Sequence, residues 1–223
     1  MPHNTLKTIL PIAMIALTLL ADPAGATSTI YPSSSDWTAV VTNVITVPFT
    51  AQAGSTAYTE FNTSAGLTVD GVNFIGFTGE QGVYNLKVYN PAYNSLLERG
   101  SGPSLGGGWS PGYLLATLPA GGVYALAVDF ATETKDRSVL ITLSSGETYT
   151  ITSPANSTMK FWGITSDVAI TDIKFSATNT LTMIDNFSYG SIPGEEAPEP
   201  MGLMLGGTGL AAIWLARRMR RFC

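Results

Sequence analysis

The body of this 223-residue chain is divided into short β-prone runs, and before residue 198 no stretch sustains the 3.6-residue apolar period of an amphipathic helix. The runs are rich in Val, Ile, Thr, Tyr and Phe and are bounded by Gly, Pro or Asn. About ten short strands with regular turns predict an all-β fold, a single jelly-roll-like β-sandwich. The predicted strands are 38–47, 66–77, 83–89, 113–118, 123–130, 138–143, 148–152, 161–165, 168–175 and 181–189.

Two local signals divide these runs into hairpins. Asp70-Gly71 predicts a turn or bulge inside 66–77, and Ser-Ser-Gly-Glu at 144–147 joins two cleanly alternating runs. The glycine-rich stretch 99–113 carries no such alternation and is predicted to be the most flexible region of the body. It lacks the Gly-Lys-Ser/Thr ending of a phosphate-binding loop.

Two residue types are missing from the body, and their absence limits its chemistry. The only histidine is His3, and the only cysteine is Cys223. A domain at 27–190 therefore has no Ser-His-Asp or Cys-His nucleophile, no His or Cys metal ligand and no disulfide. We expect a non-enzymatic domain without a cofactor, held together by packing.

The charge of the body excludes one class of partner. Residues 27–190 contain six basic and twelve acidic residues, so the net charge is near −6 (six minus twelve). Because no dense basic patch is present, we do not expect the protein to bind nucleic acid.

The N-terminal residues have the pattern of a secretory signal peptide. A weakly basic start precedes an apolar run at 8–20, and Ala24 and Ala26 form an A-x-A cleavage site. We predict that residues 1–26 are a signal peptide and that the chain is exported.

The C-terminal residues have the pattern of a membrane anchor. Residues 201–216 are uncharged, and a helix of this length reaches roughly 24 Å. A basic tail follows at 217–223, and under the positive-inside rule it remains cytoplasmic. We therefore predict a linker at 191–200, a transmembrane helix at 201–216 and a body outside the cytoplasm. The arginines of the predicted membrane stop are Arg217, Arg218, Arg220 and Arg221.

The order of these C-terminal features resembles the PEP-CTERM sorting signal of bacterial surface proteins. Pro198, Glu199 and Pro200 precede the apolar run and the arginines. The resemblance implies that an exosortase recognises this motif and removes the tail, and that the protein reaches the cell surface or the extracellular polysaccharide of a biofilm matrix. It leaves open whether the processed protein is released or attached. The segments 161–166 and 184–190 also resemble the closing strands of such proteins.

One carboxylate stands out in an apolar strand. Asp185 would be costly to bury unless it is paired or bound to a cation. With Asn186, and with Asp70, Glu60 or Asp129, it could supply the oxygen ligands that calcium prefers. The alternative is that Asp185 only accepts hydrogen bonds from backbone amides at a corner of the sandwich.

Two aromatic residues in the glycine-rich stretch suggest a sugar-binding platform. Trp109 and Tyr113 flank a Ser-Pro-Gly turn that can hold two rings at a fixed angle. The alternative is that these rings fold back over one end of the sandwich, whereas Trp37 and Trp162 are predicted to lie in the core. Beside a non-enzymatic surface protein, two other functions remain open, namely a carbohydrate-binding module and a small carboxylate-based glycoside hydrolase.

Overall fold

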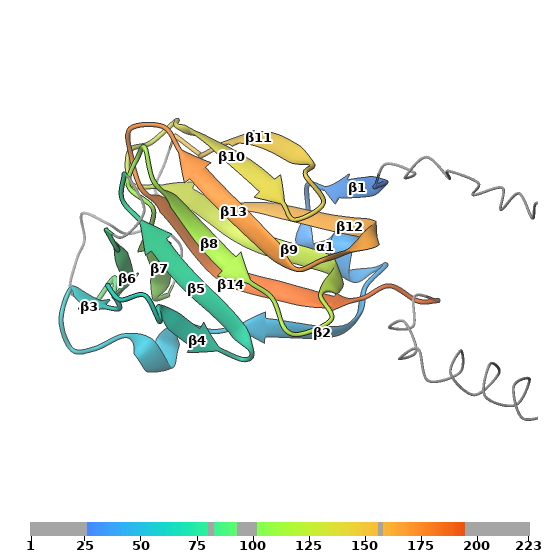
Figure 1. Cartoon of the computed structure of the whole chain (residues 1–223), viewed down its shortest axis with the longest axis horizontal. Helices are drawn as coiled ribbons and strands as arrows, with labels where there is room; N and C mark the ends of the chain where they lie inside the picture. The colour runs from blue at the N-terminus through green and yellow to red at the C-terminus, as the bar shows by residue number, and fades with distance from the viewer. Residues whose placement is uncertain (1–25, 80–82, 93–101, 156–157, 195–223) are drawn as a thin grey trace, which may run out of the picture.

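Two antiparallel β-sheets face each other across one apolar core (Figure 1). The structure is a computed structural model that describes residues 26–79, 83–92, 102–155 and 158–194. The predicted all-β sandwich is thereby confirmed. The signal peptide before Ala26, the Pro198-Glu199-Pro200 motif, the membrane segment and the basic tail lie outside the described residues. In the described ranges, no helix is long and apolar enough to cross a membrane.

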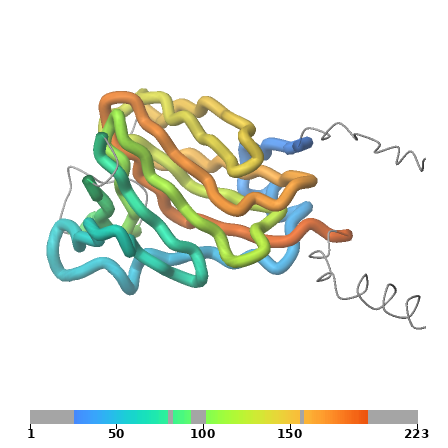
Figure 2. Tube along the Cα trace, viewed as in Figure 1, coloured from blue at the N-terminus to red at the C-terminus, as the bar shows by residue number. Residues whose placement is uncertain are grey.

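The larger sheet has eight strands and the smaller has six. The larger sheet follows the order β1 (Ser28–Tyr31), β12 (Lys160–Ile170), β9 (Val123–Thr132), β14 (Thr182–Ser191), β7 (Ser104–Gly107), β6 (Leu86–Tyr89) and β3 (Tyr58–Glu60), and β2 (Thr42–Val47) also pairs with β14. The smaller sheet follows the order β11 (Thr148–Thr152), β10 (Ser138–Leu143), β13 (Asp172–Ala177), β8 (Tyr113–Thr117), β5 (Val72–Phe77) and β4 (Leu67–Val69). Figure 2 shows the same two layers along the Cα trace.

The core forms because alternate residues of both sheets point inward. In β9 the inward side chains Leu126, Val128 and Phe130 are fully buried. Edge-to-face aromatic contacts link the two layers near the centre, with ring centroids 5.5 Å apart for Phe49 and Phe74 and 5.3 Å apart for Phe74 and Phe187. This packing leaves the outward residues of the larger sheet to form a second surface.

A five-residue helix, α1 (Ser34–Thr38), covers part of the outer face of the larger sheet. It begins where the Ser33 hydroxyl accepts a hydrogen bond from the Asp36 backbone N–H at 3.2 Å. Trp37 is 1% exposed, and its indole N–H donates to the Ile164 carbonyl at 3.2 Å. Gly163 leaves room for this ring, because an added Cβ would lie 2.8 Å from Trp37.

The structure confirms several sequence predictions and corrects others. The predicted strands 138–143 and 148–152 coincide with β10 and β11, and Asp70-Gly71 is a tight turn with φ values of 46° and 80°. The strand predicted at 38–47 was wrong at its start. The buried Trp37 belongs to helix α1, which ends at Thr38, and β2 begins only at Thr42. The boundary predicted between the runs 161–165 and 168–175 was wrong, because β12 continues to Ile170 and β13 begins only at Asp172.

The glycine-rich stretch contains a further correction. Residues 104–107 form β7, a buried strand of the larger sheet, rather than part of a flexible region. The glycines are required by close neighbours, because a Cβ at Gly106 would lie 2.5 Å from the Tyr89 ring. A 3-10 helix at Thr50–Gln52 and the short strands β1 and β3 also had no sequence prediction.

Candidate functional site

A β-bulge in β14 brings polar side chains to the outer face of the larger sheet. Asp185 pairs with Asp129 of β9, whereas Ser188 pairs with Ala127, so β14 has one extra residue between the two pairs. Asn186 has a φ of 48°, as befits a residue in such a bulge. Ile184 and Phe187 still point into the core.

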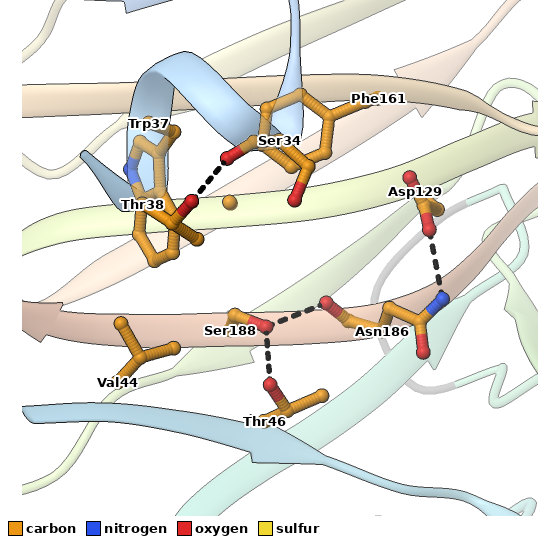
Figure 3. A pocket seen from close by; sticks show the side chains of 10 residues that line it. Ser34, Trp37, Thr38, Val44, Thr46, Asp129, Phe161, Asn186 and Ser188 are labelled. Atoms are coloured by element: carbon orange, nitrogen blue, oxygen red, sulfur yellow. Dashed lines mark hydrogen bonds between the residues drawn. The ribbon is translucent and has the colours of Figure 1, made fainter. Parts of the chain in front are cut away.

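Hydrogen bonds fix the polar groups around the bulge (Figure 3). The Asn186 backbone N–H donates to Asp185 Oδ1 at 2.8 Å. The side-chain Nδ2 of Asn186 donates to Asp129 Oδ2 at 2.8 Å. The Ser188 hydroxyl donates to the Asn186 carbonyl at 2.9 Å and lies 2.9 Å from the Thr46 hydroxyl. Two strands of the larger sheet, β9 and β2, are thus tied to β14 at the same place.

Asp129, Asn186, Ser188 and Thr46 line a cavity of about 250 Å³ between α1, β2, β14, β9 and β12. Figure 3 shows Asp129 and Asn186 on one side of the cavity and α1 with Trp37 and Thr38 on another. Phe161 supplies a half-buried aromatic ring, and the small side chain of Ala127 leaves the cavity open. The site therefore combines an aromatic surface with several positioned donors and acceptors, which is the usual composition of a small-molecule pocket.

The carboxylate of Asp185 is the most perturbed acid of this region. Burial raises the pKa of Asp185 above its ordinary value of 3.8, the negative charge of Asp129 raises it further, and the hydrogen bond from the Asn186 N–H opposes both. The pair therefore disfavours a negatively charged ligand.

The cation site predicted around Asp185 is assembled only in part. Asp185, Asn186 and Asp129 lie together, whereas Glu60 forms an ion pair with Lys87 at 2.9 Å and Asp70 lies in the β4–β5 turn. Among the described residues, no group of three or more Asp, Glu, His or Cys side chains could hold a metal ion. The alternative role predicted for Asp185, that of accepting hydrogen bonds from backbone amides, is present, because its Oδ1 accepts from the Asn186 N–H.

Asp129 and Asp185 belong to a row of residues that crosses the sheet. In the strand register, Phe161 pairs with Asp129 and Asp129 pairs with Asp185. Ser104 pairs with Tyr89, and Tyr89 pairs with Tyr58. The pairing of Ile184 with Leu105 joins these two halves of the row, because Ile184 precedes Asp185 and Leu105 follows Ser104. Side chains directly opposite each other in a pair of strands share one face. The row has five steps of about 4.8 Å and so spans roughly 24 Å, with an aromatic ring at each end. Its members are Phe161, Asp129, Asp185, Ser104, Tyr89 and Tyr58.

The structure places the predicted sugar platform away from this row. Trp109 lies between β7 and β8 and is 41% exposed. Tyr113 lies on the outer face of the smaller sheet, where its ring centroid is 4.7 Å from that of Phe77 and 4.2 Å from Lys174 Nζ. These contacts compete with a sugar ring for Tyr113. The platform remains a prediction.

Sequence reasoning had singled out Asp185, Asn186 and Asp129 for calcium but had not selected Phe161, Ser188 or Thr46. The signal available was an Asp-Asn pair inside an apolar strand, because asparagine tolerates the positive φ that Asn186 adopts in the bulge. No sequence signal joins β2 and β12 to that bulge, because their proximity arises from sheet order.

Comparisons with known proteins give no family for this chain. No family model matches it, and no curated protein matches it. Among solved structures, variants of a family 29 carbohydrate-binding module match at TM-score 0.37 with 15% identity, covering 64% of this chain and 99% of that one. A variant complexed with mannohexaose matches at TM-score 0.36 with 14% identity, covering 60% and 92%. A variant complexed with cellulohexaose matches at TM-score 0.33 with 15% identity, covering 63% and 96%. These similarities are too low to carry an argument about the ligand.

Proposed function

We propose that this protein is an exported, non-catalytic β-sandwich, of the jelly-roll-like type that its sequence predicts, which binds polysaccharide on the outer face of its larger sheet. The observation that carries the proposal is the cavity beside the β14 bulge. It combines the Phe161 ring with the hydrogen-bonded side chains of Asp129, Asn186 and Ser188.

A sugar ring matches both the aromatic ring and the hydrogen-bonding groups of this site. Its C–H face packs on an aromatic ring, and its hydroxyls both donate and accept hydrogen bonds. Asn186 and Asp129 hold each other in position before a ligand arrives, so little side-chain entropy is lost on binding. Because Asp185 and Asp129 disfavour added negative charge, we propose a neutral polymer such as a glucan rather than an acidic polysaccharide.

The glycoside hydrolase alternative rests on the same two carboxylates. Asp129 and Asp185 are cross-strand neighbours, and the pKa of Asp185 is raised by burial. In a hydrolase, however, two carboxyl groups act on opposite sides of the bond that breaks, commonly about 5–10 Å apart. Here both acids come from one row of a sheet and each accepts a hydrogen bond from Asn186, which favours binding over cleavage.

The binding proposal is tested with Asn186→Gly. Glycine accepts the positive φ of this position, so the variant loses the side chain while keeping the bulge. We expect retention of the full chain on insoluble glucan to weaken about tenfold, because hydrogen bonds are lost at the site. Reducing ends released from the same glucan would instead support the hydrolase alternative.

Asn179→Gly is the matched control for this experiment. Asn179 is an exposed turn residue with a φ of 54°, and it does not line the cavity. We expect it to bind like the unchanged protein. Equal retention of both variants, or no retention of the unchanged protein on a broad panel of neutral polysaccharides, would exclude this site.

We further propose that the protein is held at the membrane by residues 201–216 until a processing enzyme of the exosortase type recognises Pro198-Glu199-Pro200. The support is the order of motif, apolar run and arginines in the sequence. Glu199→Ala is expected to leave expression unchanged and to block loss of the tail in a host with exosortase, as followed by mass spectrometry. Glu195→Ala, in the preceding linker, is the control. Normal processing of Glu199→Ala would count against the sorting signal.

A further inference from the structure

A second cavity opens at one edge of the sandwich, between β12 and β1 of the larger sheet and β11 of the smaller one. Its volume is about 370 Å³, at the lower end of the roughly 300–1,000 Å³ usual for small-molecule pockets. Among the residues that the structure describes, Phe161 alone lines both this cavity and the one beside the β14 bulge. The two cavities therefore offer largely separate surfaces.

The lining of this edge cavity is mostly apolar. Tyr149 and Ile151 point inward from β11 but stay half-buried, and Ile30 of β1 is 45% exposed. The Tyr149 and Trp162 rings lie 5.8 Å apart at an interplanar angle of 52°. Apolar side chains that remain open to solvent at this edge favour an apolar occupant.

One of the residues that line the cavity, Trp162, carries a buried hydrogen-bond donor. Trp162 is 3% exposed, yet its indole N–H has no hydrogen-bond partner among the described residues. The other fully buried indole, that of Trp37, donates to the Ile164 carbonyl. Because an unpaired buried donor is unfavourable, a molecule that brings an acceptor to Trp162 gains more than its apolar contact alone.

We infer that the edge cavity binds a small apolar molecule that carries a hydrogen-bond acceptor for the Trp162 indole N–H. The volume has room for roughly ten non-hydrogen atoms, since a water-sized group takes about 30 Å³. Lys160 lines the same cavity and is exposed, so an anionic acceptor such as a carboxylate is favoured. A medium-chain fatty acid has this chemistry. The site differs from the proposed polysaccharide site in both place and ligand class.

The test is a titration of the full chain, labelled with ¹⁵N at tryptophan, with octanoate. We expect the indole N–H signal of Trp162 to shift and saturate, while that of Trp37 stays in place because its partner is internal. Trp162→Phe, which keeps an aromatic ring and removes the donor, identifies the signal.

Calorimetry supplies the second measurement. We expect octanoate to bind Trp162→Phe about tenfold more weakly, because the lost hydrogen bond is to a charged group. Asn186→Gly, at the other cavity, is expected to bind octanoate unchanged. The inference is overturned if the Trp162 signal does not move, if Trp37 moves equally, or if Trp162→Phe binds octanoate as well as the unchanged protein does. Loss of polysaccharide binding alone would not contradict the inference about the edge cavity.

Discussion

Asp185 shows how a single residue carries an energetic cost at the candidate site. Its carboxylate is partly buried beside Asp129, and burial raises its pKa above 3.8. In the folded state it therefore keeps its proton to a higher pH than in the unfolded state. The free energy of unfolding must fall as pH rises through the window between the two pKa values, and the ionised form is destabilising above that window.

We therefore predict that Asp185→Asn stabilises the domain at neutral pH. The amide oxygen of asparagine can still accept the hydrogen bond from the Asn186 N–H, while the buried charge is removed. Thermal unfolding of the variant is expected a few degrees higher at pH 7. The difference should vanish in acid below the ordinary pKa of 3.8, where Asp185 is protonated in both the folded and the unfolded state. A lower melting temperature at pH 7 would contradict this account of the carboxylate.

Strand β7 shows how glycine can build a strand that lacks an apolar pattern. Gly106 lies under the Tyr89 ring, and Gly107 lies against the backbone of Gly76 and Asn85. Tyr89 is 6% exposed and packs with Leu181 and Met183. A Cβ at Gly106 would also lie 3.2 Å from Leu181 Cδ1, so the absence of a side chain at Gly106 is a packing requirement.

Gly106→Ala is predicted to destabilise the domain by about 1–3 kcal/mol, because the added methyl group overlaps the Tyr89 ring. Gly102→Ala is the control, since a Cβ there meets nothing within 4 Å. It is expected to change stability by less than about 0.5 kcal/mol. Chemical denaturation measures both. Equal stability of the two variants would show that Tyr89 adjusts freely.

The contrast between strands with apolar alternation and strand β7, which lacks it, explains what the sequence could predict at the scale of elements. Alternation placed β10 and β11 with the correct bounds, and Asp70-Gly71 was identifiable because both residues favour positive φ. Strand β7 was missed because its identity depends on Tyr89, which is distant in sequence. Helix α1 was missed because five residues are too few to show a helical period.

Across the whole molecule, the outer face of the larger sheet is divided by side-chain type. Trp37, Val41, Ala125 and Ala127 form one apolar cluster on this face, and a second contains Tyr89, Leu181 and Met183. The carboxylates of Asp129 and Asp185 come from β9 and β14, the same strands that carry Ala127 of the first cluster and Met183 of the second. Composition could limit the chemistry of this face to carboxylates, amides, hydroxyls and rings, but only the strand order reveals which of them meet.

The central claim is that polysaccharide binds beside the β14 bulge. It is tested most directly by mapping backbone amide shifts of the full chain on titration with a soluble oligosaccharide of the glucan that retains it. The account predicts that the largest shifts fall on Asp129, Asn186 and Ser188, with little change at Trp109 and Tyr113. Shifts gathered at Trp109 and Tyr113 would contradict it and favour the loop platform predicted from the sequence.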